Sequence, residues 1–156
     1  MEPKSFVRLA RLSDIDEVVK LCSEHARFEK ANFSPEGKAE RLSSAIFTAV
    51  PRLWCFVAES RGSIVGYATC TKDFSTWGAA DFLHMDCLYL DPVHRNAGIG
   101  TEMMRRISWH ADALNCATVE WQTPVWNSNA TVFYQKLGAT SSEKVRFLWD
   151  RRRFIA

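Results

Sequence analysis

The chain has 156 residues, 47% of them hydrophobic and 24% charged, and its formal net charge is +2. This length and balance predict one folded domain of the soluble type over residues 1–156. The charge is too small to indicate a nucleic-acid partner, and no segment is apolar and long enough to predict a membrane span.

The first third of the chain predicts one strand and two helices. Residues 5–10 have the pattern of a short strand. Ser13 has the character of a helix N-cap, with Asp16 three residues later as in a capping box, and apolar residues then recur at helical spacing to about Phe28. Residues 34–50 predict a second helix with a weak opening turn.

The rest of the chain alternates strands and helices. Residues 53–60 and 63–70 flank Arg61-Gly62 and predict a hairpin with a tight turn. Further elements follow in the order strand 81–90, helix from about 98, strand 116–123, helix 127–138 and strand 145–150. This order predicts a mixed sheet with helices on its faces.

The number and spacing of the cysteines indicate the redox compartment of the protein. There are five, far apart and without a C-x-x-C pair. An odd number of isolated cysteines with apolar neighbours predicts reduced, mostly buried thiols in a cytoplasmic protein. No spacing of histidines and cysteines predicts a metal site.

A glycine loop separates the strand 81–90 from the helix that follows. Its sequence is Arg95-Asn96-Ala97-Gly98-Ile99-Gly100. A helix N-terminus offers unpaired N–H donors, and glycine lets the backbone approach an anion closely, so the loop predicts a phosphate site; a plain turn is the alternative. The loop lacks the lysine of a nucleotide P-loop, and the third glycine of a dinucleotide fingerprint is replaced by Met103.

The loop matches R-x-x-G-x-G, and over nearly its whole length the chain resembles the GCN5-related N-acetyltransferase (GNAT) family. The stretches "RLARLSD", "ARFEK", "SIVGYA", "VWNSNATVFYQKLGA" and "SSE" are most similar to the spermidine/spermine (diamine) acetyltransferase branch. The resemblance implies an α/β (α+β) fold. It consists of a mixed, mostly antiparallel sheet of six to seven strands with about four helices, and acetyl-CoA lies in the V-shaped splay between two central strands.

The resemblance also implies which residues bind acetyl-CoA. They form a strand backbone, the pyrophosphate loop and two residues downstream: Leu88, Tyr89 and Leu90; Arg95, Asn96, Ala97, Gly98, Ile99, Gly100 and Thr101; Asn127 and Lys136. Judged by the residues themselves, Asn127 could instead cap the helix that follows it, and Lys136 could be a solvated surface lysine. No metal is implied.

Two residues are implied in the chemistry. Tyr134 follows Asn127 by seven residues and matches the general acid that protonates the departing CoA thiolate. Asp86 stands where the polyamine enzymes carry a glutamate; it would accept the amine proton, through a bridging water because aspartate is one methylene shorter. The implied substrate contacts are Phe28, Glu29, Trp77, Asp86 and Glu143. A packed aromatic or a solvated carboxylate is the alternative at each position.

The implied activity is acetyl transfer from acetyl-CoA to a primary amine of a small cationic substrate, polyamine- or diamine-like, by direct attack in a ternary complex. The alternatives are an aminoglycoside or amino-acid N-acetyltransferase of the same fold and a non-catalytic acyl-CoA sensor. The resemblance further implies a homodimer. A shorter loop after Gly138 and a lysine at Lys144 depart from the polyamine enzymes, so the amine stays open.

Overall fold

The computed structural model describes residues 5–154. The chain divides into two compact units, Met1–Pro124 and Val125–Ala156. The first unit contains a five-stranded sheet in the order β1-β2-β3-β4-β5, antiparallel except for the parallel pair β4–β5. Its strands are β1 (Phe6–Leu9), β2 (Trp54–Ser60), β3 (Ser63–Ser75), β4 (Ala80–Leu90) and β5 (Val119–Trp121).

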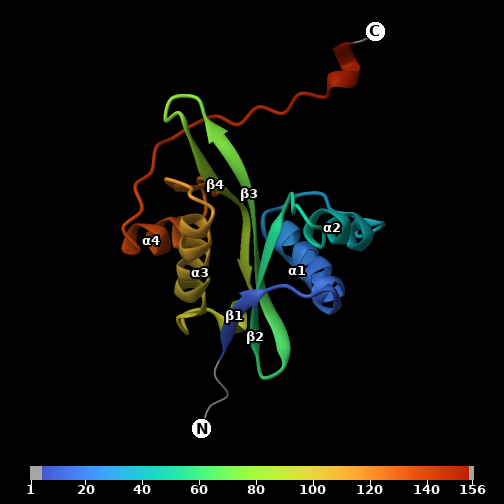
Figure 1. Ribbon diagram of the computed structural model, residues 1–156. Coiled ribbons are helices and arrows are strands. Elements are labelled where there is room, and N and C mark those ends of the chain that lie inside the picture. Colours follow the sequence, from blue (N-terminus) through green and yellow to red (C-terminus); the bar gives the residue numbers. More distant parts are fainter. Residues whose placement is uncertain (1–4, 155–156) are drawn as a thin grey trace. The chain divides into compact units, whose positions relative to one another are not determined.

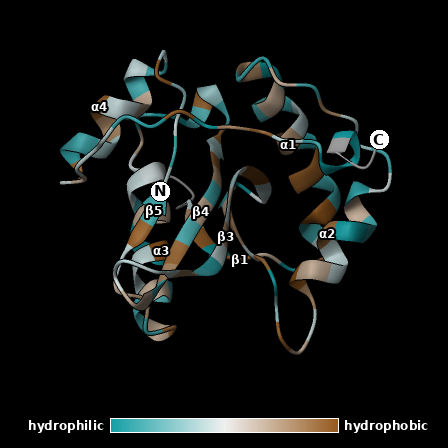
Figure 2. Ribbon diagram, turned by 90° about the horizontal axis from the view of Figure 1, so that it is seen from above, coloured by the Kyte–Doolittle hydropathy of each residue, from teal (hydrophilic) through white to brown (hydrophobic). Residues whose placement is uncertain are grey.

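Three α-helices of the first unit cover the sheet. They are α1 (Ile15–Phe28), α2 (Lys38–Ile46) and α3 (Ile99–Ala113). Figure 1 shows α1 and α2 on one side of the sheet and α3 on the other. α1 and α3 each bury one apolar face, as expected for amphipathic helices in such a layered fold, whereas no residue of α2 is fully buried. Figure 2 shows hydrophobic residues along the strands and mixed colours on the helices.

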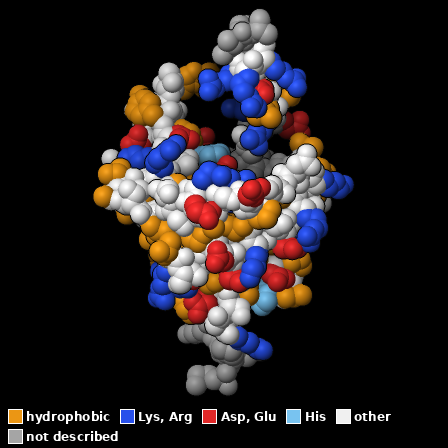
Figure 3. Space-filling model, turned by 90° about the vertical axis from the view of Figure 1, so that its right-hand side faces the viewer, with side chains coloured by type: hydrophobic (Ala, Val, Ile, Leu, Met, Phe, Trp, Pro, Cys, Tyr) orange, Lys and Arg blue, Asp and Glu red, His pale blue; other side chains and the backbone are white. Residues whose placement is uncertain are grey.

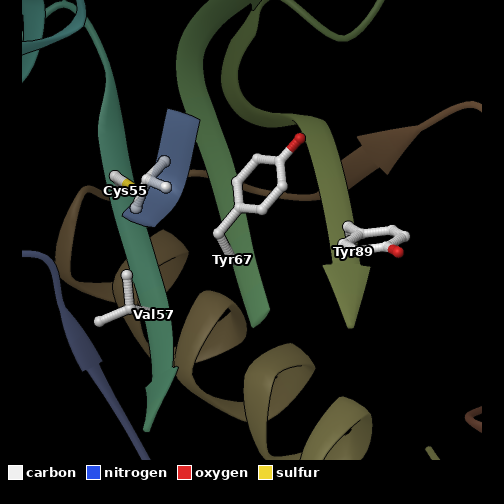
Figure 4. Packing of buried hydrophobic residues seen from close by; sticks show 5 residues of the cluster. Cys55, Val57, Tyr67 and Tyr89 are labelled. Atoms are coloured by element: carbon white, nitrogen blue, oxygen red, sulfur yellow. The ribbon is translucent and has the colours of Figure 1, made fainter. Parts of the chain in front are cut away.

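The core lies on both sides of the sheet. Towards α1, the residues Val18, Cys55, Val57, Tyr67 and Tyr89 form one buried cluster. Figure 4 shows how the strand members of this cluster project from β2, β3 and β4. On the side of α3, the buried residues Met103, Ile107 and Ala111 come from a single stripe of that helix.

The beginning of α1 differs from the sequence prediction. Ser13 is not the N-cap: it lies inside a 3₁₀ turn, Leu12–Asp14, and α1 begins at Ile15. The carboxylate of Asp14 accepts the N–H of Arg11 at 2.7 Å and two hydrogen bonds from Arg8, at 2.7 and 3.1 Å. Asp14 takes the N-cap position of α1, but its carboxylate makes no capping hydrogen bond to that helix; it instead ties the backbone of Arg11 and the Arg8 guanidinium to the 3₁₀ turn.

The second unit contains α4 (Ser128–Lys136), closed as predicted by Gly138 at φ +91°, and a 3₁₀ turn at Arg151–Phe154. The predicted final strand at 145–150 is wrong. These residues have no strand conformation, and Val145, Phe147, Leu148 and Trp149 are 68–94% exposed. Their alternating pattern is typical of a strand, but a strand also needs a second strand to satisfy its backbone N–H and C=O groups, and the described residues of this unit contain no other strand.

The expected fold class is confirmed, with four α-helices and a mixed, mostly antiparallel sheet. The sheet has five strands among residues 5–154 in place of six to seven. The second helix is shorter than predicted, since Gly37 adopts φ +65° directly before it. None of the helices described is both long and apolar enough to cross a bilayer.

Candidate active site

The central feature of the site is the separation of β4 from β5. The two strands pair only from Leu83 to Met85, opposite Val119 to Trp121. β4 continues for five residues beyond Met85, to Leu90, while β5 ends. In the described part of the sheet, the backbone of residues 86–90 therefore has no strand partner on that side, as expected for a strand that binds an extended ligand through its backbone.

Asp86 lies at the point where this separation begins. Thr69 pairs with Cys87 and Cys70 with Met85, so Asp86 is the extra residue of a β-bulge. Its side chain is 63% exposed, and His84 Nε2 lies 3.9 Å from its Oδ1. The Asp86 carboxylate thus faces solvent beside the open stretch of β4, where it could accept a proton from an incoming amine.

The glycine loop connects the end of β4 to α3 as predicted. Asn96 and Gly98 both have positive φ, +62° and +80°, and no atom lies within 4 Å of the position that a Cβ on Gly98 would take. The first intrahelical hydrogen bond runs from the N–H of Glu102 to the carbonyl of Gly98. The N–H groups of residues 99–101 are thus the unpaired donors of a helix N-terminus, the arrangement that binds phosphate.

Arg95 connects this loop with the end of α1. Its Nε donates to the carbonyl of Leu90 at 2.9 Å. Its guanidinium lies 5.2 Å from the ring centre of Phe28 and 5.6 Å from that of Tyr89. This stacking brings Phe28, a predicted substrate residue, beside the predicted cofactor loop.

Glu29 follows Phe28 at the end of α1, and its Oε1 lies 3.1 Å from His25 Nε2. The other nitrogen of this histidine, Nδ1, lies 2.8 Å from the Tyr67 hydroxyl. Neither His25 nor Tyr67 was singled out from the sequence. The spacing of His25 and Glu29, four residues apart on a helix, was a usable signal, whereas nothing in the sequence indicated Tyr67.

Trp77 is placed apart from the other first-unit residues. It lies in the turn between β3 and β4, beyond the last pair Ser75–Ala80, and is 98% exposed. Asp86 is six residue steps from Ala80, which corresponds to about 20 Å along β4. Within one chain, the first unit therefore does not bring Trp77 together with Asp86.

The predicted residues of the second unit lie on α4 and in the segment after it. Asn127 caps α4, since its Oδ1 accepts the N–H of Ala130 at 3.2 Å, which leaves its amide donors for another partner. The ring of Tyr134 packs against that of Phe133, 5.1 Å between centroids. Lys136 and Glu143 are exposed.

Burial suppresses the nucleophilicity of the thiol beside the candidate base. It raises the pKa of Cys87 to about 12, so the reactive thiolate is scarce near neutral pH. Figure 3 shows acidic and basic side chains interspersed on the face that carries α1 and α2. A charged ligand that approaches this face would therefore meet individual side chains of both signs rather than one large surface of one sign.

Comparisons with known proteins agree with this geometry. The sequence profile of the acetyltransferase (GNAT) family matches residues 18–139. A thialysine N-epsilon-acetyltransferase of Mus musculus is 30% identical over 141 residues, 85% of this chain and 82% of that protein. A spermidine/spermine N(1)-acetyltransferase-like protein 1 of Homo sapiens is 26% identical over 140 residues, 85% of this chain and 20% of that protein. A solved structure of aminoglycoside N-acetyltransferase AAC(6')-Iy in complex with CoA has a TM-score of 0.81 at 15% identity, with 97% of each chain covered.

The separated strands and the glycine loop at a helix N-terminus are compatible with an acyl-CoA-dependent transferase, and the family match and the relatives give that class. The chain belongs to the acetyltransferase (GNAT) family, and it is an acetyl-CoA-dependent N-acetyltransferase. The family resemblance read from the sequence is thereby confirmed.

Proposed function

We propose that the protein transfers the acetyl group of acetyl-CoA to the terminal primary amine of a small cationic substrate with a flexible alkyl chain. Polyamines, diamines and lysine-like amino acids such as thialysine share this chemistry. Two relatives, a thialysine N-epsilon-acetyltransferase and a spermidine/spermine N(1)-acetyltransferase-like protein, support the same class. The single observation that carries the proposal is the exposed Asp86 carboxylate at the bulge where β4 leaves β5.

In the proposed mechanism, the backbone of Leu88–Leu90 binds the acetyl and pantetheine groups, and residues Asn96–Thr101 bind the pyrophosphate. The amide of Asn127 donates to the pantetheine arm, and Lys136 lies near the phosphates. Asp86 takes a proton from the ammonium, through a water, because alkyl amines are protonated near pH 7. The neutral amine then attacks the thioester carbonyl in the ternary complex, and Tyr134 protonates the CoA thiolate as it leaves.

Direct attack is favoured over a covalent acetyl-enzyme. The only cysteine on the open stretch of β4 is Cys87, whose raised pKa disfavours the thiolate. Mass spectrometry after incubation with acetyl-CoA alone should therefore show no acetylated Cys87. We also expect the protein to act in the cytoplasm as a homodimer, which light scattering can test.

Free CoA thiol is followed with acetyl-CoA and separate pools of polyamines, lysine-like amino acids and aminoglycosides. We expect release with one of the first two pools, reduced 10- to 100-fold by Tyr134→Phe and by Asp86→Asn. Gln135→Ala, an exposed change on the same helix as Tyr134, is the matched control and should retain activity. Release of CoA thiol with aminoglycosides alone would show that the substrate is an aminoglycoside. Binding of acetyl-CoA without thiol release in the presence of any pool would favour a non-catalytic sensor.

A further inference from the structure

His25 joins a surface carboxylate to a buried hydroxyl. Its Nε2 lies 3.1 Å from Glu29 Oε1 and its Nδ1 lies 2.8 Å from the Tyr67 hydroxyl. The side chain of His25 is only 13% exposed, and its ring stacks on Tyr89 with 5.2 Å between centroids and 22° between planes. Both nitrogens and one face of the ring are thus engaged, which holds the imidazole in one orientation.

The neighbours of His25 determine where its proton lies. An ionised Glu29 can only accept, so Nε2 must carry a hydrogen and donate it. Nδ1 can then accept the hydroxyl proton of Tyr67, which projects from β3 towards β4 (Figure 4). Burial raises the pKa of Tyr67 far above its ordinary value, so this hydroxyl stays protonated. The two hydrogen bonds therefore point the same way: the Tyr67 hydroxyl donates to Nδ1 of His25, and Nε2–H of His25 donates to the Glu29 carboxylate.

Glu29 differs in its partner from the glutamates of the helices that pair with lysine or arginine. Glu17 pairs with Lys20, Glu24 with Arg27, and Glu102 with two arginines. Among the described contacts, Glu29 instead pairs with the His25 imidazole through one carboxylate oxygen, and its side chain is 36% exposed. A carboxylate at a helix C-terminus is disfavoured by the helix dipole, so its position here calls for a specific partner.

We propose that His25 is a positioning residue for the amine substrate: its Nε2–H holds Glu29 by one carboxylate oxygen and leaves the second oxygen directed outward to bind a substrate ammonium. This inference rests on the proposed function, because it takes Glu29 to be a substrate contact. It assigns a role to His25 and Tyr67, neither of which is among the site residues predicted from the sequence. The residues act through Glu29 and do not touch the reacting atoms.

The test separates binding of the amine from chemistry. His25→Phe keeps a flat ring against Tyr89 but removes the donor; it should raise the KM for the amine about tenfold, while kcat and the KM for acetyl-CoA change less than threefold. His25→Gln, which can still donate to Glu29, should restore most of the loss. Glu29→Gln, which removes the ammonium partner itself, should raise the amine KM at least as much as His25→Phe does. The double variant should be no worse than Glu29→Gln alone, because His25 acts only through Glu29. Glu24→Gln, on the same helix, is the matched control.

Folding of each variant is checked by thermal unfolding, and Glu29→Gln serves as the second variant if His25→Phe does not fold. An unchanged amine KM in a folded His25→Phe, or additive effects in the double variant, would overturn the proposal. Nitrogen-15 spectra of the wild-type histidines give a readout independent of turnover: we expect Nε2 of His25 to carry the proton, and a proton on Nδ1 alone overturns the proposal. If the wild type releases no thiol with any amine, the proposed function has failed. The same variants are then compared by calorimetry with spermidine as the probe: a weaker affinity in His25→Phe supports the positioning role, and an equal affinity rejects it.

Discussion

Gly66 lies on β3 where it faces the end of the proposed cofactor strand, β4, at close range. It pairs with Leu90 at the end of β4. A Cβ on Gly66 would lie 2.8 Å from Leu90 Cδ1 and 2.9 Å from the carbonyl oxygen of Tyr89. The leucine methyl can rotate away, but the carbonyl belongs to the backbone of β4. Gly66→Ala should therefore push the open stretch of β4 out of position.

The magnitude follows from two opposing effects. Forcing an extra methyl into a packed contact costs about 1–3 kcal/mol. Replacing glycine by alanine also restricts the unfolded chain, which offsets about 0.4–1 kcal/mol. The net destabilisation is about 1–2 kcal/mol, and for a chain of this size it lowers the Tm by roughly 2–8 °C.

The assay combines thermal unfolding with calorimetric titration of acetyl-CoA. Gly66→Ala should lower the Tm and weaken acetyl-CoA binding, because the displaced backbone is the one proposed to hold the thioester. Gly62→Ala is the matched control: Gly62 has φ +79° in the β2–β3 turn, and no atom lies within 4 Å of its Cβ position. It should lower the Tm through backbone strain but leave the acetyl-CoA affinity unchanged. A folded Gly66→Ala with wild-type Tm and affinity would refute the reasoning.

Three further predictions concern stability and reactivity. Burial raises the pKa of three thiols, those of Cys55, Cys70 and Cys87, to about 12. A thiol reagent at pH 8 should therefore label them only after unfolding, and rapid labelling of the native protein would contradict this. Burial lowers the pKa of His110 from 6.5, so the unfolded state binds more protons below that value and the free energy of unfolding should fall as the pH drops through 6.5; denaturant titrations should show a smaller fall for His110→Phe. Asp14→Ala removes the acceptor of the Arg11 N–H and a partner of Arg8 and should cost about 2–4 kcal/mol at pH 7. The hydrogen bond from Arg8 lowers the pKa of Asp14, so this difference should shrink as the pH falls below 3.8, and a pH-independent difference would contradict the assignment.

The sequence predicted those elements whose causes are local. The turn at Arg61-Gly62 was readable because a tight hairpin turn requires positive φ, which glycine adopts easily. Arg61 and Gly62 have φ values of +52° and +79°. The helix after Gly98 was readable because its apolar residues recur on one face. The place of the glycine loop between a strand and a helix was readable for the same reason, since glycine and a helix start are both local features; its binding of phosphate stays a prediction.

The sequence failed where a distant partner decides the outcome. Residues 145–150 alternate like a strand, but alternation does not supply an edge to pair with. β3 extends to Ser75, five residues beyond the predicted end at Cys70, because it pairs with β4 from Gly66 as far as Ser75. The position of Trp77 follows from this extension: the long hairpin carries it to a tip that the sequence does not reveal.

The bulge at Asp86 explains why one short stretch can serve both the core and the site. In a regular strand, Met85, Cys87 and Tyr89 would all face the same side. The extra residue reverses the alternation, so that Cys87 and Tyr89 pack in the cluster towards α1 while Met85, opposite Cys70, is turned to the other side of the sheet. Asp86 is left between the two orientations, 63% exposed, one residue after the pairing with β5 ends. Any change that removes the bulge would have to bury this carboxylate or rotate the core residues outward, so the exposure of the candidate base and the packing of Tyr89 depend on the same irregularity of β4.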